Sequence, residues 1–221
     1  MERIPEPELM DEDAQARAYA QADFEEPHAQ FIAWFRERFA GASVTGAVID
    51  LGCGPADISI RFAQAFPECH VHGVDGAAAM LRYGREAVRA ADLAERVRLL
   101  EGYLPGAALP QVHYDIIISN SLLHHLADPT VLWREIRARA APGTLTFIMD
   151  LMRPGDQRAA QVLVDTYAEG EPEVLRHDFF NSLLAAYQPE EVEAQLAAAG
   201  LGWLEVRVAS DRHLVVSGVC G

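Results

Sequence analysis

VIDLGCGPAD, residues 48–57, is the stretch that decides the fold of this 221-residue chain. Its apolar start predicts a buried strand that delivers the carboxylate of Asp50. Gly52 and Gly54 then predict a tight turn that a ligand can approach closely, and the helix that follows adds the positive end of its dipole. Dinucleotide-binding turns carry a third glycine where this chain has Asp57. Because a carboxylate repels a pyrophosphate, the turn predicts a ligand other than a diphosphate.

Strands and helices alternate on the C-terminal side of this turn. Short apolar runs predict buried strands at residues 47–51, 71–75, 97–101, 114–119 and 144–150. Helical patterns separate them at residues 55–66, 77–91 and 129–141. This alternation predicts βαβ units and a doubly wound, Rossmann-like α/β sheet. After a helix at residues 189–199, strand-like runs at 203–209 and 213–219 are joined by a short turn, which predicts an antiparallel hairpin.

The first 46 residues predict a helical cap. One helix is expected from Asp11 to Phe24, and Pro27 opens a second helix. The second helix carries an apolar stripe with i, i+4, i+8 spacing that must pack against something: Phe31, Phe35 and Phe39. We therefore expect residues 1–46 to cap a domain formed by residues 47–221, in which the long connection 152–188 is an insertion on the substrate side.

Composition narrows the classes of function. The formal net charge is −15 and all 18 basic residues are arginine, so the surface repels phosphate backbones and anionic membranes. Nucleic acid is therefore disfavoured as a partner. No apolar run approaches the roughly 20 residues that span a bilayer, and the acidic N-terminus is unlike a basic leader, which predicts a cytoplasmic protein without membrane contact. Three cysteines without a CxxC pair predict neither a disulfide framework nor a zinc ribbon.

A second carboxylate ends the next predicted strand. Asp75 lies about 20 residues beyond the glycine turn, the spacing at which a carboxylate binds a ribose diol. Taken singly, a glycine turn is often only a turn, and a strand-end aspartate is often only a helix cap. On consecutive βα units the two together predict a ligand that contains a nucleoside.

These segments resemble the class I S-adenosylmethionine-dependent methyltransferases, by motif over residues 47–150 and by element order to the C-terminus. The matching motifs are VIDLGCGPAD, HVHGVDGAAAML, HYDIIISNSLLHHLADP and APGTLTFIMD. The resemblance implies a seven-stranded mixed sheet, with S-adenosyl-L-methionine as cofactor and S-adenosyl-L-homocysteine as product. It also implies a cofactor site made of Asp50, Gly52, Cys53, Gly54, Asp75, Gly76, Met80, Gly102, Tyr103, Asn120 and Ser121.

The resemblance also assigns parts of the cofactor to parts of this site. The glycine turn would meet the amino-acid portion, Asp75 the ribose, and Asn120 and Ser121 the methionine end. Tyr103 stands where the family often has an acidic residue for the adenine amino group. Its ring can stack on adenine, its hydroxyl can hydrogen-bond, or the backbone can make this contact instead.

Methyl transfer from a sulfonium requires alignment, and it requires a base only if the acceptor must lose a proton. His125 and His124 are the candidate catalytic residues. We expect the two adjacent rings to diverge, with one packed and the other solvated. No metal site is expected, because no nearby ligand pair has a recognisable spacing.

Substrate contacts are expected from the N-terminal cap and from the 152–188 insertion. The candidate substrate-binding residues are Tyr19, Phe24, His28, His177, Phe180 and Asn181. In the C-terminal hairpin, Asp211, Arg212 and His213 are interpreted as turn residues.

The sequence thus predicts an enzyme that transfers a methyl group from S-adenosyl-L-methionine to an unidentified small-molecule acceptor. The alternatives are an RNA or protein methyltransferase, a non-catalytic cofactor-binding sensor or partner subunit, and a nicotinamide-dependent oxidoreductase. The acidic charge argues against RNA, the intact Gly52, Gly54 and Asp75 argue against a decayed site, and Asp57 argues against a nicotinamide cofactor. The acceptor atom and the oligomeric state stay open.

Overall fold

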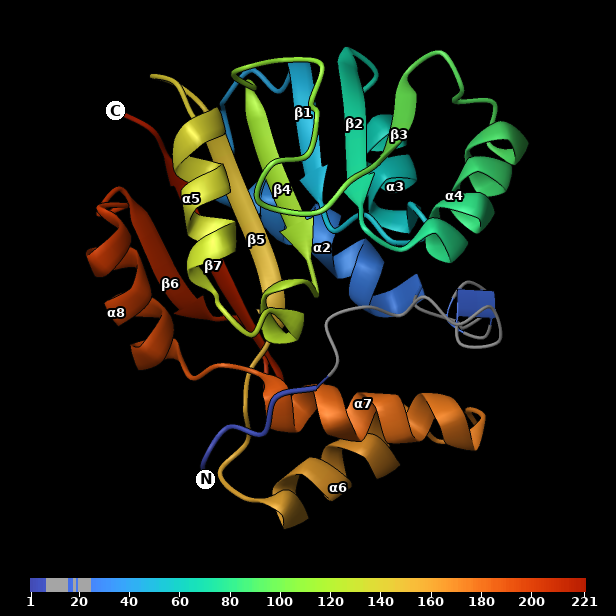
Figure 1. Cartoon of the computed structure of the whole chain (residues 1–221), viewed down its shortest axis with the longest axis vertical. Helices are drawn as coiled ribbons and strands as arrows, with labels where there is room; N and C mark the ends of the chain where they lie inside the picture. Colours follow the sequence, from blue (N-terminus) through green and yellow to red (C-terminus); the bar gives the residue numbers. More distant parts are fainter. Residues whose placement is uncertain (7–15, 18, 20–24) are drawn as a thin grey trace.

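A seven-stranded sheet with helices on both faces forms the centre of the molecule (Figure 1). The computed structural model describes residues 1–6, 16, 17, 19 and 25–221. The strands are β1 (Gly46–Leu51), β2 (Cys69–Asp75), β3 (Val97–Glu101), β4 (Ile116–Asn120), β5 (Leu145–Leu151), β6 (Leu204–Val208) and β7 (His213–Val219). Their order is β3-β2-β1-β4-β5-β7-β6, and β7 runs antiparallel to both β5 and β6. The predicted doubly wound mixed sheet with a C-terminal antiparallel hairpin is confirmed.

The helices divide into two layers and a group at one end of the sheet. They are α2 (Glu25–Arg38), α3 (Asp57–Ala65), α4 (Ala78–Ala90), α5 (Thr130–Arg139), α6 (Gln157–Tyr167), α7 (Glu173–Ala185) and α8 (Pro189–Ala199), with a 3-10 helix η1 (Leu123–His125). α2, α3 and α4 pack on one face of the sheet, and α5 and α8 pack on the other. α6 and α7 lie beyond the carboxyl ends of the parallel strands (Figure 1).

The aromatic stripe of α2, which Phe39 continues just after the helix, packs against the sheet. Phe31, Phe35 and Phe39 have ring centroids 5.0, 5.7 and 6.5 Å from the ring of Phe147 on β5, in edge-to-face arrangements. These side chains are buried in one cluster with residues of β1, β4 and β5. The second predicted helix therefore shares the core of the sheet. Most of the first predicted helix, from Asp11 to Phe24, lies outside the described residues.

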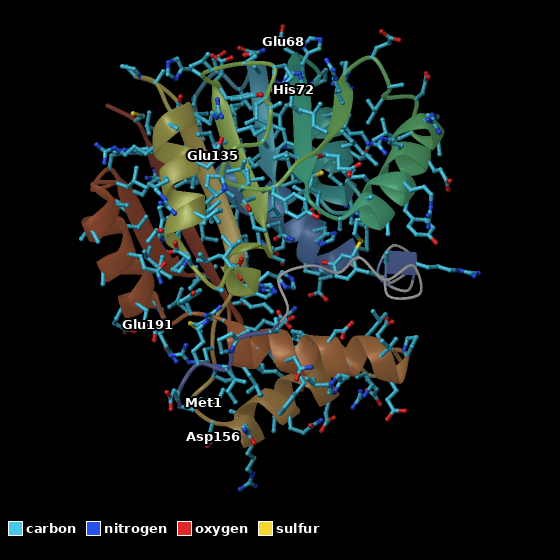
Figure 2. All side chains as sticks on the ribbon, in the orientation of Figure 1. Met1, Glu68, His72, Glu135, Asp156 and Glu191 are labelled. Atoms are coloured by element: carbon cyan, nitrogen blue, oxygen red, sulfur yellow. The ribbon has the colours of Figure 1, made fainter. Side chains whose placement is uncertain are left out.

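The strand order reverses between β1 and β4, which places a crevice at their carboxyl ends. Figure 2 shows Glu68, which precedes β2, at one end of the sheet, and Met1 and Asp156 at the opposite end beside α6 and α7. The glycine turn opens toward this second end. Within the part of the chain that the structure describes, no helix combines the length and the apolarity needed to cross a bilayer.

Candidate cofactor and acceptor site

The turn between β1 and α3 is held against the end of β2. The backbone N–H groups of Gly52 and Cys53 donate to the carbonyl oxygen of Val74 at 2.9 and 3.1 Å. Gly52 has a φ of +72°, and a Cβ atom there would lie 2.8 Å from a methyl carbon of Leu122. Gly54 has a φ of +50° and open space where its Cβ would be. The backbone therefore favours glycine at both positions, and the second leaves room for a ligand.

Asp75 stands at the end of β2, directly beside this turn. Its Oδ2 accepts a hydrogen bond from Gly54 N at 2.8 Å, and its Oδ1 accepts one from Ala77 N at 2.8 Å. These two bonds orient the carboxylate at the carboxyl ends of neighbouring strands. The two motifs that the sequence placed on consecutive βα units therefore meet in space.

Asp50 lies beneath the turn and is almost completely buried. Its Oδ2 accepts a hydrogen bond from the Ser59 hydroxyl at 2.5 Å. Burial raises the pKa of Asp50 to about 7, against the lowering effect of the Ser59 hydrogen bond, and the charge of Asp75 adds to the increase. The folded protein therefore favours the neutral form of this carboxyl group.

Asp50→Asn tests this environment through the pH dependence of stability. Because the pKa in the folded state lies above its ordinary value of 3.8, the stabilising contribution of Asp50 is fully present below 3.8 and is lost as the pH rises to about 7. The asparagine stays neutral, so we expect the wild type, relative to the variant, to lose up to about 1.4 kcal/mol per pH unit within this window. Urea unfolding across the pH range measures the difference. Asp92→Asn, at an exposed aspartate, is the control, and equal slopes in the wild type and Asp50→Asn would contradict the prediction.

Asp57 connects the turn to α2. His28 Nδ1 lies 2.6 Å from its Oδ2, and Arg61 Nε donates to the same oxygen at 2.6 Å. Burial alone would raise the pKa of Asp57, but the hydrogen bonds from His28 and Arg61 outweigh it and lower the pKa. The sequence argument took Asp57 as a carboxylate that repels diphosphates. The structure adds that Asp57 is paired with Arg61, which also binds both carboxylate oxygens of Glu25.

The residues predicted for the cofactor all line one cavity of about 800 Å³. This volume lies within the range of small-ligand pockets. Met80 is buried in its wall, whereas Tyr103 is 61% exposed. The Oδ1 atom of Asn120 is buried and has no hydrogen-bond partner among the described residues. A ligand donor at this position would satisfy it.

A second cavity of about 450 Å³ adjoins the first. The lining residues that the two cavities share are Tyr19, Glu25, His28, Asn120, Ser121 and His125. From this boundary the second cavity extends to α6, α7 and the turn between β6 and β7. The site is therefore a larger chamber beside the glycine turn that leads into a smaller one at the end of β4.

Helix α7 contributes different residues from those predicted. The side chains of α7 that line the second cavity have i, i+3, i+4, i+7 spacing and are Leu175, Asp178, Phe179 and Ser182. His177, Phe180 and Asn181 lie on other faces of the helix, which corrects this part of the predicted substrate site. His177 is exposed, and Phe180 packs against the core between α6 and α7. The sequence indicated a polar and aromatic segment but did not reveal the rotation of the helix about its axis.

The candidate substrate-binding residues of the N-terminal cap have different outcomes. Tyr19 and His28 line both cavities. Phe24 lies outside the described residues.

His124 is buried and paired with a carboxylate that was not predicted as a site residue. Its Nδ1 lies 2.6 Å from Asp150 Oδ1, while Asp150 Oδ2 accepts a hydrogen bond from Leu123 N at 2.7 Å. Burial alone would lower the pKa of His124, but the charge and hydrogen bond of Asp150, together with Glu6, outweigh burial and raise it. A sequence signal for Asp150 existed, since it stands at the end of a predicted strand as Asp75 does.

The two adjacent histidines face the same way. Their ring centroids lie 4.2 Å apart with an interplanar angle of 38°. The expectation that these rings diverge is therefore wrong. Glu6 Oε1 lies 3.6 Å from His124 Nε2 and 3.2 Å from His125 Nδ1. Burial raises the pKa of Glu6, against the lowering effect of His124. No local pattern connects Glu6 with histidines so distant in the sequence.

His213 has a larger part in the site than its interpretation as a turn residue suggested. It is buried at the start of β7 and lines the second cavity. Burial and the charge of Arg212 lower the pKa of His213 to about 4. The guanidinium of Arg212 lies 3.3 Å from the ring centroid of Tyr167, which ties this turn to α6.

Comparison with known proteins agrees with this geometry. Residues 48–143 match a family model described as a methyltransferase domain. A demethylmenaquinone methyltransferase from Listeria welshimeri is 34% identical over 108 residues, which cover 48% of this chain and 45% of that protein. A trans-aconitate 2-methyltransferase from Azoarcus sp. is 29% identical over 119 residues, which cover 54% and 44% of the two chains. The chain thus matches less than half the length of these curated relatives.

A solved structure extends the likeness to the whole fold. An S-adenosylmethionine-dependent methyltransferase from Aquifex aeolicus aligns with a TM-score of 0.67 at 16% identity, covering 95% of this chain and 99% of that one. At that identity the alignment shows a shared fold, and the family model adds the motif region. Residues 48–143 are therefore similar to a methyltransferase domain, and the whole chain shares its fold with a solved S-adenosylmethionine-dependent methyltransferase.

Proposed function

We propose that this protein binds S-adenosyl-L-methionine in the larger cavity and transfers its methyl group to a small molecule in the adjoining one. The observation that carries the proposal is that the two cavities meet at Asn120 and Ser121. This is where the family resemblance places the methionine end of the cofactor. A methyl group at that boundary faces the smaller chamber.

The larger cavity offers a suitable group for each part of the cofactor. Asp75 accepts hydrogen bonds from the ribose hydroxyls, and the turn at Gly52 and Gly54 admits the amino-acid portion. The orphaned Oδ1 of Asn120 accepts a hydrogen bond from the ammonium group. Tyr103 and Gly102 flank the adenine.

Methyl transfer then proceeds as an in-line displacement. The acceptor lone pair forms a bond to the methyl carbon while the carbon–sulfur bond breaks, and its electron pair stays on sulfur to give S-adenosyl-L-homocysteine. An acceptor atom that carries a proton must also release it. We assign assistance in this release to His125 and His124, because both line the acceptor cavity.

The charge of the smaller cavity indicates the kind of acceptor. Its described charged lining residues, apart from histidines, are Glu25, Glu26, Glu171, Asp178 and Arg212. The single guanidinium is itself paired with Asp211 at 3.3 Å. An excess of carboxylates repels anions, so a neutral or cationic acceptor fits better than a tricarboxylate such as trans-aconitate. The net charge of −15 likewise counts against nucleic acid.

Residues 1–46 act as a cap and residues 152–188 as a substrate-side insertion on the domain formed by residues 47–221. Support comes from the lining of the smaller cavity, to which α2, α6 and α7 all contribute side chains. An acceptor enclosed by these helices is shielded from water during transfer.

Calorimetric titration with S-adenosyl-L-methionine, S-adenosyl-L-homocysteine and NAD tests the proposal. We expect the first two ligands to bind and NAD not to bind. Mass spectrometry then follows S-adenosyl-L-homocysteine formation with amines, phenols and thiols, and trans-aconitate serves as the anionic comparison. Binding of NAD alone would contradict the proposal. Cofactor binding without turnover on any acceptor would favour a sensor instead.

A further inference from the structure

Three side chains that commonly bind metal ions converge beside the acceptor cavity, which the two histidines among them line. They are Glu6, His124 and His125, and their donor atoms all lie within 4.8 Å of one another. Only 11%, 3% and 17% of these side chains are exposed, respectively. We propose that they form a binding site for a divalent transition-metal ion, for which Zn²⁺ best matches the ligand set.

The spacing of the donor atoms suits such an ion. Tetrahedral zinc with bonds of about 2.0–2.1 Å to nitrogen and oxygen places neighbouring donor atoms about 3.3 Å apart. Glu6 Oε1 lies 3.2 Å from His125 Nδ1 and 3.6 Å from His124 Nε2. These two separations lie on either side of that value, and all three donor atoms lie within 4.8 Å of one another.

The surroundings of His124 also match those of a metal ligand. Ligating histidines usually donate their second ring N–H to a carboxylate, which fixes the tautomer and makes the ligand nitrogen more basic. His124 Nδ1 is 2.6 Å from Asp150 Oδ1, so the neutral ring with its proton on Nδ1 has a lone pair at Nε2, which lies 3.6 Å from Glu6 Oε1. Asp150 is in turn held by the backbone N–H of Leu123, the residue that precedes His124.

The N-terminal segment that carries Glu6 is fixed at this place. It runs beside α7 (Figure 1), where Ser182 Oγ donates to Glu6 Oε1 at 3.0 Å. The guanidinium of Arg3 donates to the backbone oxygens of His124 and Leu126 at 2.9 and 3.0 Å. These contacts hold the carboxylate of Glu6 against the histidine pair.

Two imidazoles and one carboxylate leave a fourth position of the ion for water or substrate, as in catalytic zinc sites. Both histidines line the acceptor cavity, so this position faces the acceptor. An acceptor oxygen or nitrogen bound there would release its proton to water more readily, so the two histidines would assist this release through the ion rather than by accepting the proton themselves. That role rests on the proposed function, whereas metal binding can be measured without it.

Titration of the chelator-treated 221-residue chain with ZnCl₂ tests the site. We expect one ion per chain by calorimetry, and the visible spectrum of tetrahedral cobalt when CoCl₂ replaces zinc. Glu6→Gln, which keeps an acceptor for Ser182, and His125→Asn should each weaken zinc binding at least about a hundredfold. Glu2→Gln and His177→Asn change an exposed carboxylate and an exposed histidine, and they should bind zinc as the wild type does.

The absence of stoichiometric binding by the wild type would overturn the proposal and leave the cluster as a simple ion pair. So would unchanged zinc affinity in both Glu6→Gln and His125→Asn, with folding checked by circular dichroism. Titration of the same samples with S-adenosyl-L-homocysteine distinguishes the two proposals. Cofactor binding without zinc binding refutes the metal site alone, and zinc binding without cofactor binding refutes the proposed function alone.

Discussion

Asp75→Ala is expected to weaken the binding of S-adenosyl-L-homocysteine by about ten- to a hundredfold. Hydrogen bonds to a charged group contribute about 1.5–3 kcal/mol, and the proposed ribose contact loses its carboxylate acceptor in this variant. Calorimetry measures the dissociation constant directly. Unchanged affinity would mean that the ribose lies elsewhere.

The experiment must distinguish the loss of the proposed ribose contact from the loss of the hydrogen bonds that Asp75 accepts from the protein backbone. Asp75 also accepts hydrogen bonds from Gly54 N and Ala77 N, so alanine loosens the turn as well. Asp75→Asn keeps one acceptor oxygen and should therefore lose affinity with less effect on the free energy of unfolding. Glu101→Gln is the matched control, because Glu101 pairs with Asp75 in the parallel register of β2 and β3 but is exposed.

The geometry of the proposed cofactor side of the site was predictable from the sequence because its residues stand at fixed places in the βα order. Right-handed crossovers bring the carboxyl ends of parallel strands to one edge, so an acidic residue at the end of one strand and a glycine turn after another must meet there. Asp75 and Gly54, which are hydrogen-bonded at 2.8 Å, show this directly. In this part of the chain, the position of a residue in the local strand and turn pattern is enough to predict where the sheet topology places it.

The proposed acceptor side was less predictable because it depends on contacts between distant segments. The polar and aromatic composition of residues 176–181 was visible, but the cavity receives Asp178, Phe179 and Ser182 because of the rotation of α7 about its axis. The contact between Glu6 and His124 depends on how the N-terminal segment lies along α7. Neither this contact nor the rotation of α7 produces a periodic pattern or a characteristic residue spacing in the sequence.

Gly52→Ala is expected to lower the free energy of unfolding by about 2–5 kcal/mol. A left-handed backbone costs a residue with a side chain about 1–2 kcal/mol, and overpacking against Leu122 adds about 1–3 kcal/mol. Gly200→Ala isolates the first contribution, because Gly200 has a φ of +69° and the nearest atom to an added Cβ would be 3.8 Å away, on the flexible side chain of Arg137. We expect that control to lose only about 1–2 kcal/mol in urea unfolding.

The same pair of variants tests whether the turn shapes the cofactor cavity. Leu122 lines the larger cavity, so a methyl group at position 52 that displaces it also moves the cavity wall. Gly52→Ala should therefore weaken binding of S-adenosyl-L-homocysteine, whereas Gly200→Ala should not. Adding Leu122→Ala to Gly52→Ala removes the methyl carbon that would lie 2.8 Å from the alanine Cβ and should restore part of the lost affinity. If the double variant binds no better than Gly52→Ala, the loss comes from the strained backbone of the turn rather than from the displaced wall.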